Sequence, residues 1–74
     1  MKLSDLKIGK KYKIINIKDN KAFKYKFIDL GIKKDTEIEI ENISILKANI
    51  KLRIRNYTVV MRDYEVATLE MREL

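Results

Sequence analysis

Apolar residues recur at helical spacing in one part of the chain. Phe23, Phe27 and Leu30 are separated by four and three residues, so they share one face of a helix. We expect this helix to span about residues 21–30, and it is the only segment with a clear helical period. The pattern therefore predicts one short helix packed on a structure built from other elements.

The residues beside this helix supply signals for both of its ends. Gly31 follows directly and can adopt the left-handed backbone of a C-terminal cap. Ile32 then occupies the position at which such a cap makes its hydrophobic contact. Asp19 or Asn20 is expected to cap the start of the helix.

Outside the helix, apolar and polar residues alternate with the period of two that is typical of half-buried strands. We expect strands at residues 12–18, 37–41 (continued by 43–45), 50–55, 57–61 and 68–72. Their inward-facing side chains should be those of Tyr12, Ile14, Ile17, Ile38, Ile40, Ile50, Leu52, Ile54, Tyr57, Val59, Met61, Leu69 and Met71.

Irregular positions in this pattern predict a bulge and specific turns. Ile14 and Ile15 are adjacent, and a β-bulge there would restore the inward direction of the following residues. Asp35 lies in the turn after the helix, and Asn56 lies in the turn between two strands. Both residue types tolerate a positive φ. Residues 63–67 fit a single helical turn.

The short strands and tight turns favour one mainly β domain over residues 1–74, folded as a small closed barrel. Closure would remove exposed strand edges. Leu3, Leu6 and Ile8 are expected to close one end of it.

The composition excludes several classes of function. The chain has no His and no Cys, which removes the commonest general base, the commonest metal ligand and any thiolate site. No catalytic group, cofactor site or small-molecule site is predicted. Glu37, Glu39 and Glu41 share one strand face, but this spacing is more typical of a solvated strand than of a metal site.

The net charge is +6, with 17 Lys and Arg against 11 Asp and Glu. This charge permits attraction to nucleic acid, but only Tyr25 and Tyr64 remain as exposed aromatic rings, too few for a base-stacking platform. The acidic face of residues 37–41 and the basic face of residues 51–55 should form ion pairs if the two strands are neighbours. No apolar run is long enough to span a membrane, and we expect a cytoplasmic protein.

Several segments, taken in order, resemble one family. Residues 27–32 (FIDLGI), followed by Thr36 and residues 37–41 (EIEIE), resemble the R-L-x-D-L-G-[IL]-x-x-G-x-x-[IV] signature of the FeoA family. Residues 50–62 are similar to its I-x-[IV]-x-[IV]-R-G-Y-x-[IL]-x-L-R segment, and residues 63–71 to its closing R-x-E-A-x-x-I-x-V segment.

Two departures from the family pattern fall in turns. Asp35 and Asn56 stand where the family prefers Gly, and these residue types can keep a positive φ. Lys26 stands where the family often has Arg, so it keeps the charge but loses bidentate pairing.

The resemblance implies an SH3-like barrel of five to six strands with one short α-helix at about residues 21–30. It also implies an accessory role in bacterial ferrous iron uptake, by docking on the membrane permease FeoB near its cytoplasmic GTPase domain. Recruitment to the inner face of the plasma membrane and self-association into a homo-oligomer are consistent with that role. The same barrel occurs in metal-dependent repressors.

The docking surface is expected on the helix and the segment that follows it. The expected partner-binding residues are exposed and mostly basic: Lys24, Tyr25, Lys26, Ile28, Lys33 and Lys34. Lys24 and Lys26 lie off the apolar face of the helix and should be solvated, whereas Tyr25 and Ile28 flank it. The alternative function is a small basic domain that binds nucleic acid or acts as a repressor-type interaction module.

Overall fold

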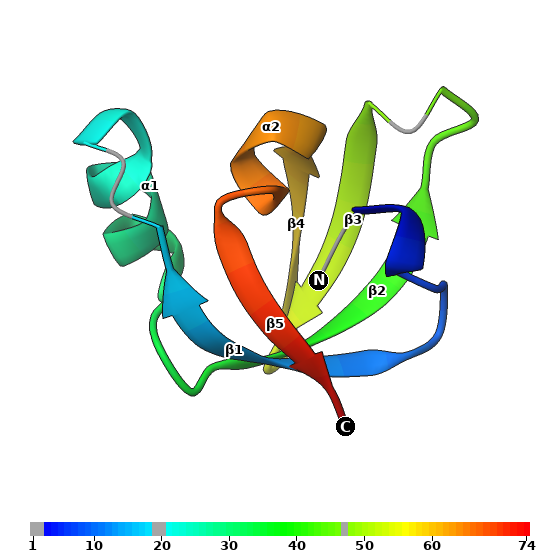
Figure 1. Cartoon of the computed structure of the whole chain (residues 1–74), viewed down its shortest axis with the longest axis horizontal. Helices are drawn as coiled ribbons and strands as arrows, with labels where there is room; N and C mark the ends of the chain where they lie inside the picture. The colour runs from blue at the N-terminus through cyan, green and yellow to red at the C-terminus, as the bar shows by residue number, and fades with distance from the viewer. Residues whose placement is uncertain (1–2, 19–20, 47) are drawn as a thin grey trace.

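A computed structural model describes residues 3–18, 21–46 and 48–74 of the chain (Figure 1). The elements are η1 (Leu3–Asp5), β1 (Lys11–Ile17), α1 (Lys21–Leu30), β2 (Glu37–Ile43), β3 (Asn49–Ile54), β4 (Tyr57–Arg62), α2 (Asp63–Val66) and β5 (Leu69–Glu73). The helix therefore has the bounds that its apolar period predicted. The expected cap residues Asp19 and Asn20, and the side chain of Leu3, lie outside the described part.

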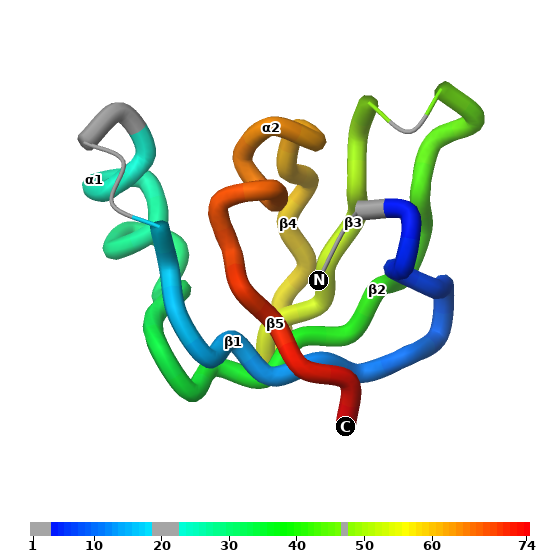
Figure 2. Tube along the Cα trace, viewed as in Figure 1, coloured from blue at the N-terminus to red at the C-terminus, as the bar shows by residue number. Residues whose placement is uncertain are grey.

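The five strands form one antiparallel sheet in the order β4-β3-β2-β1-β5. The mainly β fold class is confirmed, and the strand number is the lower of the two expected. The sheet is not closed, because β4 and β5 are its two edges. The chain leaves β4 directly into the helical turn α2, which lies over the space between β4 and β5, so these strands do not pair (Figure 2).

The predicted bulge in β1 is present. The pairing of β1 with β5 shifts between Ile14 and Asn16, which leaves Ile14 fully buried and Ile15 exposed. A second bulge, which the sequence pattern did not predict, lies in β2 between Ile40 and Asn42. The intervening residue, Glu41, thereby lies beside the basic face of β3.

The core contains most of the residues that were expected to face inward. The buried apolar side chains are those of Leu6, Tyr12, Ile14, Phe27, Ile32, Ile38, Ile40, Ile50, Leu52, Ile54, Met61, Val66, Leu69 and Met71. Ile17, Phe23 and Val59 are only half-buried against it. Two expectations were wrong. Ile8 is 57% exposed, since it lies in the loop between η1 and β1, and Tyr57 is 38% exposed at the end of β4.

The expected cross-strand ion pairs between β2 and β3 are present in part. Glu41 lies 3.9 Å from both the Lys51 ammonium and the Arg53 guanidinium. All three groups keep contact with solvent, so each pair contributes at most a few tenths of a kcal/mol. The main effect of these ion pairs is local, because Glu41 offsets part of the positive charge of Lys51 and Arg53 on the outer face of β3.

The turn after the helix and the turn between β3 and β4 differ in how well they were predicted. Asp35 has a φ of 72°, as expected. In the β3–β4 hairpin the residue with positive φ is Arg55, at 56°, and the assignment to Asn56 was wrong. Ile54 pairs with Tyr57, so Arg55 is the first of two loop residues and takes the left-handed position.

Replacement of Arg55 by glycine should therefore stabilise the fold. A left-handed non-glycine residue costs roughly 1–2 kcal/mol, part of which is offset by the greater freedom of glycine in the unfolded chain. We expect Arg55→Gly to raise the Tm by about 2–4 °C. Asn56→Gly is the matched control and should not raise it. A thermal melt in which only Asn56→Gly is stabilised would contradict this assignment.

Candidate functional site

The C-terminal end of α1 is a Schellman cap. The Ile32 N–H donates to the Phe27 carbonyl at 2.8 Å, and the Gly31 N–H donates to the Ile28 carbonyl at 3.1 Å. Gly31 has a φ of 75°, as its position predicted. The cap turns the chain so that Ile32 enters the core and Lys33 follows at the surface.

Tyr57 fixes this end of the helix to the β3–β4 hairpin. Its hydroxyl donates to the Leu30 carbonyl, one of the groups that a helix end leaves without an intrahelical partner. A Cβ atom placed on Gly31 would lie 3.0 Å from that hydroxyl oxygen. The exposure of Tyr57 thus has a structural reason, and glycine is needed at residue 31 for both conformation and space.

A cleft lies between α1, the end of β1 and the loop that joins α1 to β2. Its volume is about 330 Å³. Four of its lining residues are apolar and four are lysines: Ile17, Phe27, Ile28 and Ile32, and Lys18, Lys24, Lys33 and Lys34. Figure 1 shows α1 beside β1 at one side of the sheet. We refer to this feature as the lysine-rimmed cleft.

Four of the six expected docking residues lie together on this cleft, namely Lys24, Ile28, Lys33 and Lys34. Lys24 and Ile28 are one turn apart on α1, so they share a face. Tyr25 does not line the cleft and is 75% exposed on another face of the helix. Lys26 also lies away from the cleft.

Lys26 is exposed, as expected, but it also pairs with a buried carboxylate, which the sequence did not predict. Its ammonium lies 2.6 Å from Glu65 Oε2, and the Glu65 side chain is only 4% exposed. The other carboxylate oxygen of Glu65 accepts a hydrogen bond from the Arg62 backbone N–H at 2.9 Å, at the start of α2. Burial alone would raise the pKa of Glu65, but the Lys26 ammonium and the Arg62 N–H and charge outweigh it and hold the pKa below its ordinary value.

Aromatic rings add a second contact between the two helices. The Phe23 and Tyr64 rings lie 5.7 Å apart, and Phe23 also contacts Phe27 at 6.1 Å. Tyr64 remains 58% exposed, in agreement with the sequence. The Lys26–Glu65 pair and the Phe23–Tyr64 contact together position α1 against α2.

The sequence comparison identifies the family. A family model for the FeoA domain matches residues 1–73. The chain belongs to the FeoA family. A search of curated proteins finds no significant match.

Several solved structures are similar to this FeoA domain along the whole chain. An FeoA-like protein from Clostridium acetobutylicum is 31% identical, with a TM-score of 0.87, and the alignment covers 100% of this chain and 86% of that protein. FeoA from Chlorobium tepidum is 23% identical with a TM-score of 0.86, covering 100% and 70%. Iron(II) transport protein A from Clostridium thermocellum is 27% identical with a TM-score of 0.90, and this chain spans 46% of its length.

The fold is SH3-like, and it also occurs as part of larger proteins. A manganese-dependent transcriptional repressor matches with a TM-score of 0.89 at 17% identity, and the alignment covers 36% of that chain. At this identity the likeness concerns the fold alone. Membership of the FeoA family implies a role related to iron transport, as an accessory component.

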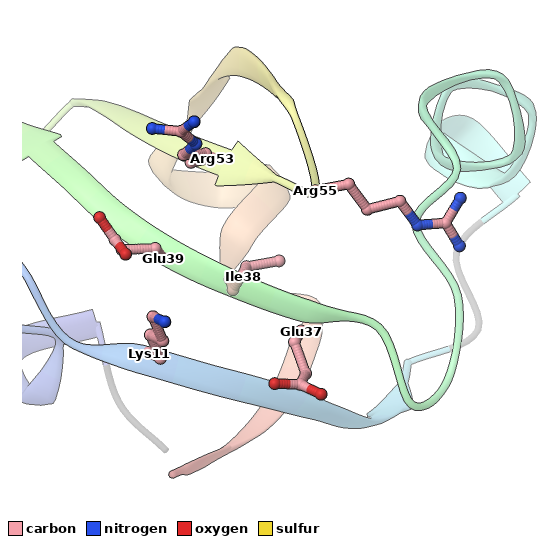
Figure 3. A pocket seen from close by; sticks show the side chains of 6 residues that line it. All are labelled: Lys11, Glu37, Ile38, Glu39, Arg53 and Arg55. Atoms are coloured by element: carbon pink, nitrogen blue, oxygen red, sulfur yellow. The ribbon is translucent and has the colours of Figure 1, made fainter.

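A second, polar pocket of this FeoA domain lies where β1, β2 and β3 are adjacent (Figure 3). It is lined by Lys11, Glu37, Ile38, Glu39, Arg53 and Arg55. Figure 3 shows acidic and basic side chains interleaved across the strands, with Arg55 extending away from the others. Such mixed charge offers no single-sign site. Within the described ranges, no three acidic side chains converge to hold a metal ion.

Sequence reasoning did not predict that Glu65 and Arg62 would help to hold α1, and it assigned Ile17 to the core without placing it in the cleft. Glu65 is the third residue of α2, where a carboxylate can accept from the backbone N–H that precedes the helix, and this spacing was a usable signal. Its pairing with Lys26 had no such signal, because the two residues are far apart in sequence.

None of the helices in the described part of the chain is long and apolar enough to cross a membrane.

Proposed function

We propose that this FeoA domain is an accessory protein of bacterial ferrous iron uptake that docks on the cytoplasmic GTPase side of a FeoB-type membrane permease. The observation that carries the proposal is the lysine-rimmed cleft, an exposed and partly apolar surface on a chain of the FeoA family. The chain would act in the cytoplasm and reach the inner face of the plasma membrane through its partner. It would regulate transport without binding the iron or catalysing a reaction.

Ile28 is the apolar residue most available to a partner at this surface. It is 60% exposed on the edge of the cleft, although it is a large aliphatic side chain. Exposed apolar groups beside a pocket are typical of interaction sites, where a few such residues contribute most of the affinity. The rest of the cleft floor is held by the core and the Schellman cap, so it is formed before binding.

Ile28→Ser should therefore weaken docking without unfolding the domain. Loss of one apolar anchor is expected to reduce affinity for the permease's cytoplasmic domain about tenfold. Binding is measured by isothermal titration calorimetry with the GDP-bound and GTP-bound forms of that domain. Ile45→Ser is the matched control, because Ile45 is 98% exposed in the β2–β3 loop and lies outside the cleft.

Two results would count against this function. One is the absence of binding to the permease domain in either nucleotide state at high micromolar concentration. The other is salt-sensitive binding to DNA or RNA in its place, which is the behaviour of the alternative, nucleic-acid-binding function. Self-association stays a separate prediction, to be checked by light scattering on the purified protein.

A further inference from the structure

We propose that the lysine-rimmed cleft recognises an acidic peptide segment that carries one bulky apolar side chain between its carboxylates. The inference rests on the proposed function, since this segment would belong to the permease, but it adds the chemistry by which the partner is recognised. It depends on the shape of the cleft, on its charge and on the rigidity of the loop that bears two of its lysines.

The shape of the cleft suits a side chain better than a cofactor. Its volume of about 330 Å³ is at the lower end of the roughly 300–1,000 Å³ of small-molecule sites. Its floor consists of aliphatic and aromatic carbon from Ile17, Phe27 and Ile32, with Ile28 on the rim. A leucine- or phenylalanine-sized group that enters this space would exchange its contact with water for contact with the apolar atoms of the floor.

The charge around the cleft has one sign. Every charged residue that lines it is a lysine, and all four lysines are exposed. Among the described residues, none of the four ammonium groups forms an ion pair. Elsewhere, Lys26 is paired with Glu65, and Lys51 and Arg53 with Glu41. The cleft thus combines an apolar floor with four lysines for which no ion pair is found in the described part of the chain, and a carboxylate-bearing segment would supply partners for them.

The lysines also surround the apolar floor instead of lying to one side of it. Lys18 follows β1, Lys24 lies on α1, and Lys33 and Lys34 lie in the loop between α1 and β2. The loop is braced, because the Lys33 N–H donates to the Thr36 hydroxyl at 3.1 Å and the Thr36 N–H donates back to the Lys33 carbonyl at 3.1 Å. Carboxylates on both sides of an apolar anchor would therefore face lysine side chains, two of which extend from a braced backbone.

The test uses the full-length protein and overlapping synthetic peptides that tile the cytoplasmic regions of the permease, with affinities measured by fluorescence anisotropy. Peptides that bind should contain acidic residues around a Leu, Ile, Met or Phe. In the best binder, replacing the carboxylates by amides or the apolar residue by Ser should each reduce affinity about tenfold. Raising the salt concentration should also weaken binding of the unaltered peptide, because salt screens the attraction between its carboxylates and the lysines.

Two charge-reversal variants separate the cleft from the overall charge. Lys33→Glu combined with Lys34→Glu should reduce affinity for that peptide at least about tenfold. Lys7→Glu combined with Lys10→Glu changes the net charge equally, at exposed residues outside the cleft, and should have little effect. Equal Tm values for the two variants would show that both are folded.

Each other outcome overturns the inference in a recognisable way. If the intact permease domain binds but both charge-reversal variants lose the same affinity for it, the inference is overturned and the docking function stands. The same conclusion follows if the peptide that binds is basic or uncharged. Failure of both the domain and all peptides to bind overturns both. Binding of anionic phospholipid vesicles in place of any peptide would assign the lysines to a membrane surface instead.

Discussion

Replacement of Glu65 by glutamine should cost about 2 kcal/mol of the free energy of unfolding at pH 7, because hydrogen bonds to a buried charged group contribute roughly 1.5–3 kcal/mol. Its carboxylate is buried and receives both the Lys26 ammonium and the Arg62 backbone N–H. In a domain of this size the loss corresponds to a fall in Tm of roughly 8–16 °C.

The same substitution should show a pH dependence of defined sign. The pKa of Glu65 is lowered in the folded state from an ordinary value of 4.5. Its ionised form therefore adds stability that is fully present above about pH 4.5 and is lost as the pH falls through the lower, folded-state pKa. The gap between wild type and Glu65→Gln should be wide in urea denaturation at pH 7 and should narrow in strongly acidic solution.

Lys26→Met gives the partner control for this pair. Lys26 is about half exposed, but its removal leaves the buried Glu65 carboxylate without its cation, so it should cost about as much as the loss of the Glu65 charge. The double variant should be less destabilised than the sum of the two single variants, because they share one interaction. A Glu65→Gln deficit that is the same at pH 7 and in strong acid would show that the carboxylate charge is not what stabilises α1 against α2.

Gly31→Ala should lower the free energy of unfolding by about 2 kcal/mol. A left-handed alanine costs roughly 1–2 kcal/mol. In addition, its Cβ would lie 3.0 Å from the Tyr57 hydroxyl oxygen and would disturb the hydrogen bond to the Leu30 carbonyl. The end of α1 would loosen, and with it the loop that carries Lys33 and Lys34. The change is measured by chemical denaturation.

Gly9→Ala is the matched control for the contact. Gly9 has a φ of 85°, but nothing lies within 4 Å of a Cβ placed there. It should therefore show the conformational cost alone, about 1 kcal/mol. In a Tyr57→Phe background the extra cost of Gly31→Ala should shrink, since the hydroxyl is gone. Equal losses for the two glycine substitutions would mean that the Tyr57 contact is unimportant.

The elements that sequence reasoning predicted well depend on short-range patterns. The helix at Lys21–Leu30, its cap at Gly31 and the bulge beside Ile15 each follow from residues within a few positions of one another. The same holds for Lys24 and Ile28, which share one helical face, and it explains why these two candidate docking residues lie together on the cleft.

The features that were missed depend on contacts between distant segments. Lys26 meets Glu65 only because α2 bridges the open side of the sheet, which the strand pattern does not reveal. The period-two pattern places Tyr57 on the same strand face as the inward residues Val59 and Met61. Tyr57 lies at the end of β4, however, where its hydroxyl reaches the end of α1. The expected closure of the barrel failed for the same reason. The pattern of a strand shows which face is buried, but not whether β4 and β5 pair with each other.

The place of β5 in the sheet has a consequence for how the chain folds during synthesis. In the described part of the chain β5 pairs only with β1, so α1, α2 and the three strands β2, β3 and β4 separate the two partners in sequence. Contacts between residues so distant in sequence slow folding, because the connecting chain must first be ordered. Leu69 and Met71 complete the core from this strand, so the domain cannot finish folding until they have emerged from the ribosome.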